Sequence, residues 1–409
     1  MDATVPQDVP RVRPRGTYGA QRGGRAVTVE DAVDLTIENV FSNIFTMTRF
    51  FDGDKKVFIE WCQGKGLLRD TEACDCGENM HLERKTSRGN GCQWKCKACK
   101  KVKTVTRLSF FENTKLTVSD ILVFINFYLL DDMTLRNVSI LSGISYSNTA
   151  VQYAAFMREI MKEYYHRKVR GMKLKGFVEI DESIFGKKRK YERGDVVSNV
   201  NVWVVGLIER GPGGRLLLYP VEDRSETTMR KIIERHVEKE ATVLTDGWAA
   251  YNWLNREGYQ HFNVIHTKAY STTYQNRTTG EKMKVDTNKI EGAWGHAKQR
   301  FKQMRGTKLP QFEGHIAELM WRHHFRGSRM SHFLSFIHEI YNLREEADLQ
   351  YTTPLFDTWD GCVAQEDQLV PEYLLEAGQE PHHRPEQLEG SAEEGEVDNV
   401  SRINFKYLR

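Results

Sequence analysis

The chain of 409 residues is long enough for about two or three domains and for a core that buries a catalytic site, which excludes a disulfide-stapled miniprotein. Its composition, 40% hydrophobic and 28% charged, is typical of a folded protein and excludes a collagen-like or wholly disordered chain. No apolar run approaches the roughly 18 residues that cross a bilayer, and residues 1–27 lack the apolar segment of a secretory signal. We therefore expect a protein that neither spans a membrane nor is secreted.

The net charge of +3 conceals a separation of charge along the chain. Residues 345–400 contain 16 acidic residues against one Arg, and residues 401–409 add three basic residues, which leaves +15 for residues 1–344. A strongly basic body indicates a polyanionic partner, and nucleic acid is the commonest one. Charge that only confers solubility is the alternative.

The first part of the chain is predicted to be an unstructured arm followed by helices. Residues 1–27 are rich in Arg, Gly and Pro and predict a disordered basic arm. Apolar residues recur at helical spacing over residues 28–70, which predicts a helical N-terminal segment. Residues 117–172 predict a helix-turn-helix region, in which two helices over 135–141 and 147–165 flank a turn at Ser142-Gly143.

Between these helical regions lies a cysteine cluster. Cys74-Asp-Cys76 and Cys96-Lys-Ala-Cys99 form two short knuckles, and four thiolates from two knuckles are the ligand set that structural Zn²⁺ prefers. Residues 71–116 therefore predict a zinc ribbon in a reducing, intracellular compartment. Cys92 or His81 could replace a ligand at the first knuckle. The alternative is a set of reduced cysteines in a small core.

Basic residues surround the second knuckle. Residues 81–108 contain nine basic residues against one acidic residue, and we expect Lys97, Lys100 and Lys101 to bind a DNA backbone. A second basic run, Lys187, Lys188 and Arg189, could clamp DNA or act as a nuclear address. A solvated charged surface is the alternative for both runs.

Residues 173–344 predict an α/β domain with a mixed sheet. Three strands of antiparallel type come first, over 177–180, 200–208 and 215–221, and strands over 242–245 and 261–266 then alternate with helices. The interpretation places helices over 225–240, 248–257, 287–304 and 316–341 and a long loop over 267–286. The acidic segment 345–409 is predicted to be a mostly disordered tail.

Three carboxylates in this domain are candidate metal ligands. Asp181 lies on or just past the first strand, Asp246 ends the strand over 242–245, and Glu291 lies near the start of the helix over 287–304. Within the first strand, Glu179 and Asp181 share a face and Glu182 points the other way. If the fold brings them together, they would repel one another unless divalent cations such as Mg²⁺ lie between them. The alternatives are an Asp-Gly turn at Asp246 and a capping box in which Asn288 and Glu291 cap the N-terminus of the helix.

Several strings of residues, in chain order, carry a resemblance to a known family. They are Cys96-Lys-Ala-Cys99-Lys, Ser109-Phe-Phe-Glu-Asn-Thr-Lys-Leu116, Val178-Glu-Ile-Asp-Glu-Ser183, Leu244-Thr-Asp-Gly-Trp248, and Thr287-Asn-Lys-Ile-Glu-Gly-Ala-Trp294 with Lys298. Over residues 70–330 the chain resembles the DDE transposases of the ISXO2/IS1595 type and their eukaryotic Merlin relatives. The resemblance implies an RNase H-like catalytic core in which Asp181, Asp246 and Glu291 hold two Mg²⁺ or Mn²⁺ ions, with Lys298 near the DNA backbone.

The resemblance also implies a function and its partners. It implies cut-and-paste transposition, in which the protein binds terminal inverted repeats and target DNA, hydrolyses phosphodiester bonds and joins the strands. A homodimer or larger assembly, acting in the nucleus of a eukaryotic host, would hold the two ends. The alternatives are a domesticated DNA-binding protein that keeps the fold without catalysis and a structure-selective nuclease on the same fold.

Overall fold

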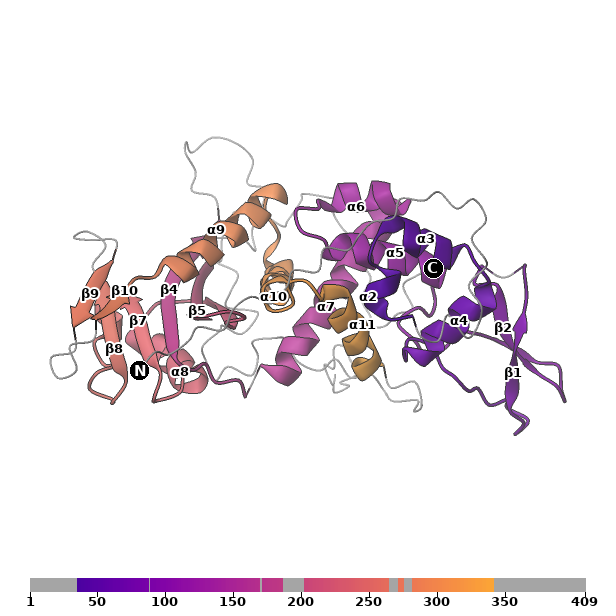
Figure 1. Cartoon of the computed structure of the whole chain (residues 1–409), viewed down its shortest axis with the longest axis horizontal. Helices are drawn as coiled ribbons and strands as arrows, with labels where there is room; N and C mark the ends of the chain where they lie inside the picture. The colour runs from indigo at the N-terminus through magenta and orange to yellow at the C-terminus, as the bar shows by residue number, and fades with distance from the viewer. Residues whose placement is uncertain are drawn as a thin grey trace, which may run out of the picture.

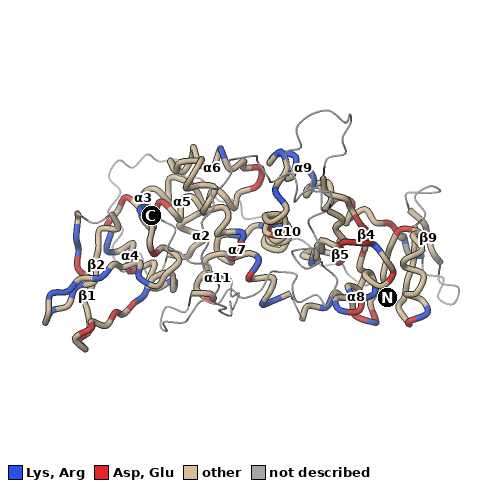
Figure 2. Tube along the Cα trace, turned by 180° about the vertical axis from the view of Figure 1, so that it is seen from behind, with Lys and Arg blue, Asp and Glu red and all other residues tan. Residues whose placement is uncertain are grey.

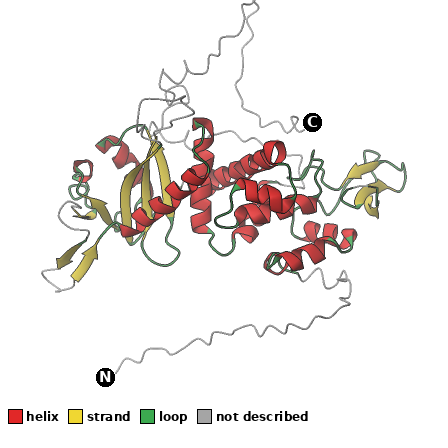
Figure 3. Cartoon of the chain, turned by 90° about the horizontal axis from the view of Figure 1, so that it is seen from above, coloured by secondary structure: helices red, strands yellow, loops and turns green. Residues whose placement is uncertain are grey.

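The computed structural model describes residues 35–87, 89–169, 171–186, 202–264, 271–275 and 282–341. The predicted basic arm, the acidic tail, and Lys187, Lys188 and Arg189 lie outside the described residues. The described parts form an elongated molecule with a small sheet at one end, a larger sheet at the other and helices between them (Figure 1 and Figure 3). Within these parts, every helix is too short or too polar to cross a bilayer.

The described part of the predicted N-terminal helical segment, residues 35–70, contains three short helices, α2 (Ile37–Val40), α3 (Ile44–Phe51) and α4 (Lys55–Gly64). Each begins after a polar N-cap residue, Thr36, Asn43 or Asp54, whose side chain accepts a hydrogen bond from a backbone N–H of the first turn. The helices enclose a cluster of aromatic rings in edge-to-face contact, which includes Phe50 and Trp61. Repeated capping therefore divides this part of the predicted helical segment into separate helices.

The cysteine region folds as a three-stranded antiparallel sheet. The strands are β1 (Met80–Arg84), β2 (Cys92–Cys96) and β3 (Val102–Thr104), in the order β1-β2-β3. The first knuckle precedes β1, and the second forms the turn between β2 and β3. The sheet therefore holds both knuckles at the same end.

The helical middle of the molecule contains α5 (Val118–Leu129), α6 (Leu135–Ser142) and α7 (Val151–Lys168). Gly143 ends α6 with a left-handed φ of 70°, and a π-helical turn, η1 (Tyr146–Ala150), leads into α7. The predicted order of short helix, glycine turn and long helix is therefore present. The C-cap favours Gly because a side chain would be strained at this φ.

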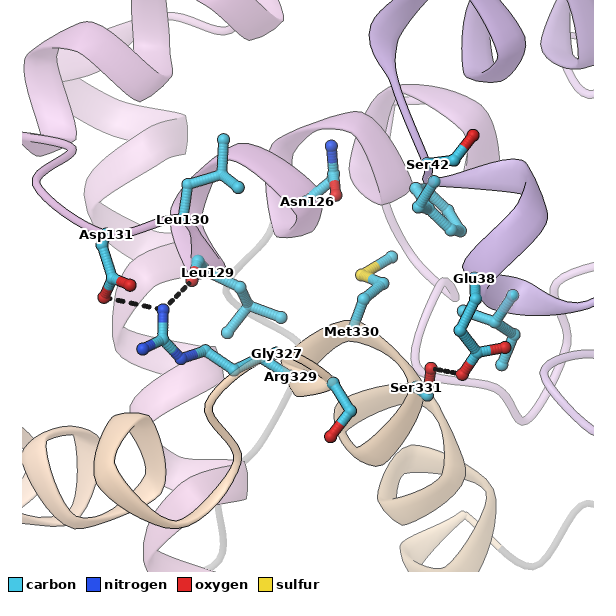
Figure 4. Close-up of a pocket in the computed structure, with 13 residues that line it drawn as sticks. Glu38, Ser42, Asn126, Leu129, Leu130, Asp131, Gly327, Arg329, Met330 and Ser331 are labelled. Carbon is cyan, nitrogen blue, oxygen red and sulfur yellow. Dashed lines mark hydrogen bonds and ion pairs between the residues drawn. The ribbon is translucent and has the colours of Figure 1, made fainter. Parts of the chain in front are cut away.

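Residues 309–340 form α10 (Leu309–His324) and α11 (Arg329–Ile340), separated near Gly327, which has a positive φ of 86°. Figure 4 shows a pocket of about 360 Å³ where α11 meets α2 and α5. There Arg329 forms an ion pair of 2.7 Å with Asp131 and donates a hydrogen bond of 3.0 Å to the Leu129 carbonyl. Helices from both ends of the described chain are joined at this point.

The larger sheet has five strands in the order β6-β5-β4-β7-β8. The strands are β4 (Phe177–Phe185), β5 (Val202–Glu209), β6 (Leu216–Val221), β7 (Thr242–Asp246) and β8 (Gln260–Val264). The first three are antiparallel, whereas β4, β7 and β8 are parallel, so the sheet is mixed as expected. Helices α8 (Glu226–His236) and α9 (Asn288–Gln303) pack on opposite faces, an arrangement that fits an RNase H-like core.

Three sequence predictions in this domain need correction. The first strand continues to Phe185, so Asp181 lies in its middle. Residues 248–257 form a short 3₁₀ helix, η2 (Ala249–Tyr251), and turns rather than an α-helix. The segment 267–286, predicted as a loop, contains the hairpin β9 (Thr272–Gln275) and β10 (Lys282–Val285). Val285 packs in a small cluster with Leu244 and Val264, and this distant apolar contact gives the polar hairpin its place on the sheet.

Candidate active site and cysteine cluster

Asp181 and Asp246 occupy corresponding positions on two neighbouring parallel strands. The register of β4 and β7 pairs Glu179 with Leu244. Extending this register by two residues places Asp181 opposite Asp246, and residues two apart on a strand share a face. The two carboxylates therefore project from adjacent strands on the same face of the sheet.

Helix α9 crosses this face directly above Asp181. Trp294 donates a hydrogen bond of 3.0 Å from Nε1 to Oδ2 of Asp181. Gly206, the β5 partner of Asp181, allows this close approach, because a Cβ at this position would lie 2.5 Å from the Trp294 ring. Glu291 lies on the same helix three residues before Trp294 and is exposed. The helix therefore brings the third carboxylate to the face that carries the two Asp residues.

The N-terminus of α9 is held by Glu179, which is only 1% exposed. Its Oε2 accepts hydrogen bonds from the backbone N–H groups of Lys289 and Ile290, at 2.8 and 3.0 Å. Its Oε1 accepts one of 2.6 Å from Nε of Arg210. A buried carboxylate from the neighbouring strand therefore caps the helix and stabilises its positive end.

The alternative role for Glu291, a capping box with Asn288, is not present in the structure. The N-cap residue is Thr287, whose side chain does not cap the helix, and the backbone donors of the first turn go to Glu179 instead. The carboxylate of Glu291 accepts a hydrogen bond of 2.8 Å from the Thr287 hydroxyl. Sequence reasoning missed this role of Glu179. The available signal was its position two residues before Asp181, on the same face of the strand.

Asp246 forms the turn that the sequence offers as the alternative to a metal ligand. Its Oδ1 accepts a hydrogen bond of 2.9 Å from the backbone N–H of Trp248. This interaction uses one of the two carboxylate oxygens and fixes the direction of the side chain. The turn is therefore compatible with a second role for Asp246.

The three carboxylates lie within electrostatic range of one another. Burial raises the pKa of Asp181, the Trp294 donor lowers it, and the charges of Asp246 and Glu291 raise it further. The oxygen atoms of the three carboxylates are not all within 4.8 Å of one another. Among the described residues, four cysteines form the one group whose ligand atoms lie that close together. Oxygen donors from three carboxylates fit Mg²⁺, for which they are the preferred protein ligands.

Glu182 projects to the opposite face of β4, as the alternation of side chains predicts. It accepts a hydrogen bond from the hydroxyl of buried Tyr251. Burial raises the pKa of Glu182 to about 7, against the opposing effects of Tyr251 and Arg224. Sequence reasoning did not foresee this pair, although Tyr251 follows Asp246 by only five residues.

The second candidate site is formed by four cysteines. Sγ of Cys74 lies 3.3 Å from Sγ of Cys99, and Sγ of Cys76 lies 3.6 Å from Sγ of Cys96. All four sulfur atoms lie within 4.8 Å of one another. Four sulfurs bound at about 2.3 Å to one tetrahedral zinc ion would be about 3.8 Å apart, so the spacing fits zinc.

The structure distinguishes these four cysteines from the other candidates. Cys92 is buried on β2 outside the group, and burial raises its pKa, which favours the thiol. His81 is also outside the group. Backbone N–H groups, chiefly that of Cys99, lower the pKa of Cys96 to about 7 and so favour its thiolate. Cys74, Cys76, Cys96 and Cys99 are therefore the residues that could hold zinc.

The candidate DNA-binding lysines lie in two separate parts of the molecule. Lys97, Lys100 and Lys101 are exposed at the tip of the small sheet, although Lys101 also forms an ion pair of 3.3 Å with Asp75. Lys298 is exposed on α9, two turns beyond Glu291. Figure 2 shows Lys and Arg along the strands of the small sheet and acidic residues near β4.

The comparison with known proteins agrees with this geometry. Residues 173–324 match the family of ISXO2-like transposase domains, a range that runs from just before β4 to the last residue of α10. None of the curated proteins compared with the chain matches it. The match includes Asp181, Asp246 and Glu291 and the sheet and helix that carry them. Residues 173–324 are thus similar to ISXO2-like transposase domains, as the resemblance in the sequence implies.

Proposed function

We propose that the chain is a cut-and-paste DNA transposase that binds terminal inverted repeats and catalyses metal-dependent phosphodiester hydrolysis and strand transfer. One observation carries the proposal: Asp181 and Asp246 lie in register on adjacent strands, beneath the helix that brings Glu291. The match of residues 173–324 to ISXO2-like transposase domains supports it.

Asp181, Asp246 and Glu291 would hold two Mg²⁺ or Mn²⁺ ions. When bound, such ions activate water or a 3′-hydroxyl and stabilise the leaving oxygen of an in-line displacement. The residues of the chain orient the ligands. Trp294 donates to Asp181, the backbone of Trp248 donates to Asp246, and Thr287 donates to Glu291. Because each carboxylate has a fixed donor, the site is organised before DNA arrives.

The remainder of the described chain would hold the DNA. In this proposal Cys74, Cys76, Cys96 and Cys99 bind one structural Zn²⁺, and the resulting zinc ribbon presents Lys97, Lys100 and Lys101 to the phosphate backbone. The helices α6 and α7 act as a helix-turn-helix that reads a terminal repeat, and Lys298 contacts the backbone near the carboxylates. Two protomers hold the two ends, in the nucleus if the chain is a eukaryotic, Merlin-type relative.

A cleavage assay tests the proposal. Full-length protein is incubated with Mg²⁺ and DNA that carries the ends of its own element, and wild type is compared with Asp181→Asn, Asp246→Asn and Glu291→Gln. We expect each substitution to reduce end cleavage by at least about 100-fold while DNA binding is retained, since each removes a ligand charge. Glu240→Gln, an exposed residue of the same domain, is the matched control and should cleave like wild type.

The same assay separates the alternatives. A wild-type protein that binds the ends but cleaves nothing with Mg²⁺ or Mn²⁺ would be a DNA-binding protein without catalysis. Cleavage that follows DNA structure and ignores the terminal repeats would indicate a nuclease. Either result would contradict the proposed transposase.

A further inference from the structure

A guanidinium group lies between two indole rings at one edge of the larger sheet. The centre of the Arg224 guanidinium is 3.6 Å from the centroid of the Trp203 ring and 4.5 Å from that of the Trp248 ring. All three side chains are partly exposed. Cation–π contacts of this kind fix the orientation of an arginine that would otherwise be mobile.

The hydrogen-bonding capacity of Arg224 is unused within the described part of the chain. No hydrogen bond or ion pair joins its guanidinium to another described residue, in contrast to Arg210, which binds Glu179 and Asp286. Because ring systems cover Arg224 from two sides, its N–H donors are available chiefly in the plane of the group. A planar, forked set of donors is the arrangement that binds the oxygens of a phosphate in pairs.

The stack lies at the carboxyl ends of β4 and β7, where Trp203 is on the face of the sheet that carries Glu182. Trp203 pairs with Ile184 near the end of β4, and Trp248 follows Asp246, the last residue of β7. Because β4 and β7 are parallel, both indoles lie at the carboxyl ends of these strands. Trp248 also takes part in the site directly, since its backbone N–H donates to Asp246.

At this position the positive charge of Arg224 can attract a DNA phosphate. Asp181, Asp246 and Glu291 are three acidic side chains at the place where a polyanionic DNA strand must approach. A fixed cation at the carboxyl ends of these strands, within electrostatic range of Glu182, offsets part of the repulsion and holds the strand in one register. Lys298 has a long flexible side chain on an exposed helix surface, whereas Arg224 is held in place by two rings.

We propose that Arg224, held between Trp203 and Trp248, binds a phosphodiester group of the DNA strand adjacent to the bond that is cut. The inference rests on the proposed function and adds a substrate-positioning residue to it. The ligand is a backbone phosphate, so the contact should be independent of base sequence.

Two variants and a matched control test the contact. Arg224→Gln removes the charge, Arg224→Lys keeps the charge but loses the forked donors, and Arg256→Gln changes an exposed arginine of the same domain. Affinity for a duplex carrying one element end is measured without divalent ions between about 50 and 200 mM NaCl, where loss of one phosphate contact lowers the slope of log affinity against log salt by about 0.9. We expect this loss for Arg224→Gln, little loss of slope for Arg224→Lys, and none for Arg256→Gln.

Cleavage kinetics provide the second measurement. We expect Arg224→Gln to raise KM about tenfold and to change kcat by less than about threefold, since the contact serves binding more than chemistry. A fall in kcat alone, with wild-type KM and salt slope, would show that the stack merely orients Asp246 through Trp248 and would overturn the proposal.

A phosphate scan with the wild-type protein avoids any dependence on how the variants fold. Single methylphosphonate groups, which are uncharged, replace phosphates one at a time around the cut site. We expect one position to weaken wild-type binding and to have no further effect on Arg224→Gln. If every position weakens both proteins equally, Arg224 binds no phosphate. If wild type binds but never cleaves, the proposed function fails, while the salt slope and the scan still decide the role of Arg224.

Discussion

The carboxylate of Glu179 on β4 accepts a hydrogen bond of 3.0 Å from the backbone N–H of Ile290, the residue that precedes Glu291 on α9. Glu179 and Asp181 lie on the same face of the strand, two residues apart. Glu179, which holds the N-terminus of α9, is therefore the neighbour on this face of Asp181, which α9 covers. The position of Glu291 relative to Asp181 depends on an acidic residue to which we assign no metal-binding role.

Substitution of Glu179 should therefore cost both stability and activity. Glu179→Ala leaves Arg210 without its buried partner and removes the cap of α9, and we expect the free energy of unfolding to fall by about 3–5 kcal/mol. Glu179→Gln keeps an acceptor for the helix and should cost about 1–3 kcal/mol. Urea unfolding of the full-length protein measures both. Losses below about 1 kcal/mol for Glu179→Ala would show that α9 is held in place by other contacts.

Gly206→Ala should displace α9 by a steric clash between the strand and the helix. The new methyl group would lie 2.5 Å from the Trp294 ring and 2.7 Å from Ile290, so the helix or the strand must shift. We expect a cost of about 1–3 kcal/mol from overpacking and a decrease in end cleavage, because the Trp294 donor to Asp181 moves.

Gly295→Ala on the same helix is the control for this substitution. A Cβ at Gly295 meets no atom within 4 Å, and replacement of a helical glycine should stabilise the protein by about 0.5–1 kcal/mol. Equal effects of the two substitutions on cleavage would refute the proposed role of close packing at Gly206.

Local patterns in the sequence were sufficient to predict the parts of the site that each lie within one element. Apolar runs that end in acidic residues predicted Asp181 and Asp246 on strands, and side-chain alternation placed Glu182 on the face opposite Asp181. The structure agrees with this placement, because Asp181 contacts α9 whereas Glu182 contacts Tyr251. These features depend on the period of a strand and can be recognised within a few residues.

The remaining features of the site depend on contacts between distant residues. The cap that Glu179 provides for α9 joins residues more than a hundred positions apart. The local string Asn288 to Glu291 could therefore suggest only a capping box as the alternative role for Glu291. Spacing alone also left Cys92 and His81 open as ligands, because only the β1-β2-β3 sheet determines which sulfurs meet. Hydrophobic periodicity missed the hairpin at residues 272–285 because its strands are short and polar.

The cysteine cluster gives a prediction about metal content. Cys99→Ser removes one of the four converging sulfurs and should reduce bound zinc, measured by mass spectrometry of the purified protein, to less than about a tenth of wild type. Cys92→Ala, which changes a cysteine outside the group, should retain about one zinc per chain. Loss of zinc from Cys92→Ala with retention by Cys99→Ser would reverse the assignment of the ligands.

A buried ionic network connects α9 and α10 to α5. Glu318 on α10 is 2% exposed and accepts hydrogen bonds from Arg300 on α9 at 2.7 Å and from Tyr128 on α5 at 2.9 Å. Arg322 donates to it at 2.9 Å. Burial alone would raise the pKa of Glu318, but Arg300 and Arg322 hold it well below its ordinary value.

Glu318→Gln should therefore destabilise the protein in a pH-dependent manner. The substitution leaves buried arginines without their anion, and we expect a loss of about 3–5 kcal/mol at pH 7, against less than about 0.5 kcal/mol for the exposed control Glu240→Gln. Because the pKa of Glu318 is lowered on folding, its stabilising contribution is complete above the unfolded pKa of about 4.3 and is lost as the pH falls through the folded value.

The gap in unfolding free energy between wild type and Glu318→Gln, measured by urea titration, should stay constant from about pH 5 to 8 and narrow below about pH 4.3. A gap that instead narrows as the pH rises would mean that Glu318 is protonated in the folded protein and that the network is held by neutral hydrogen bonds.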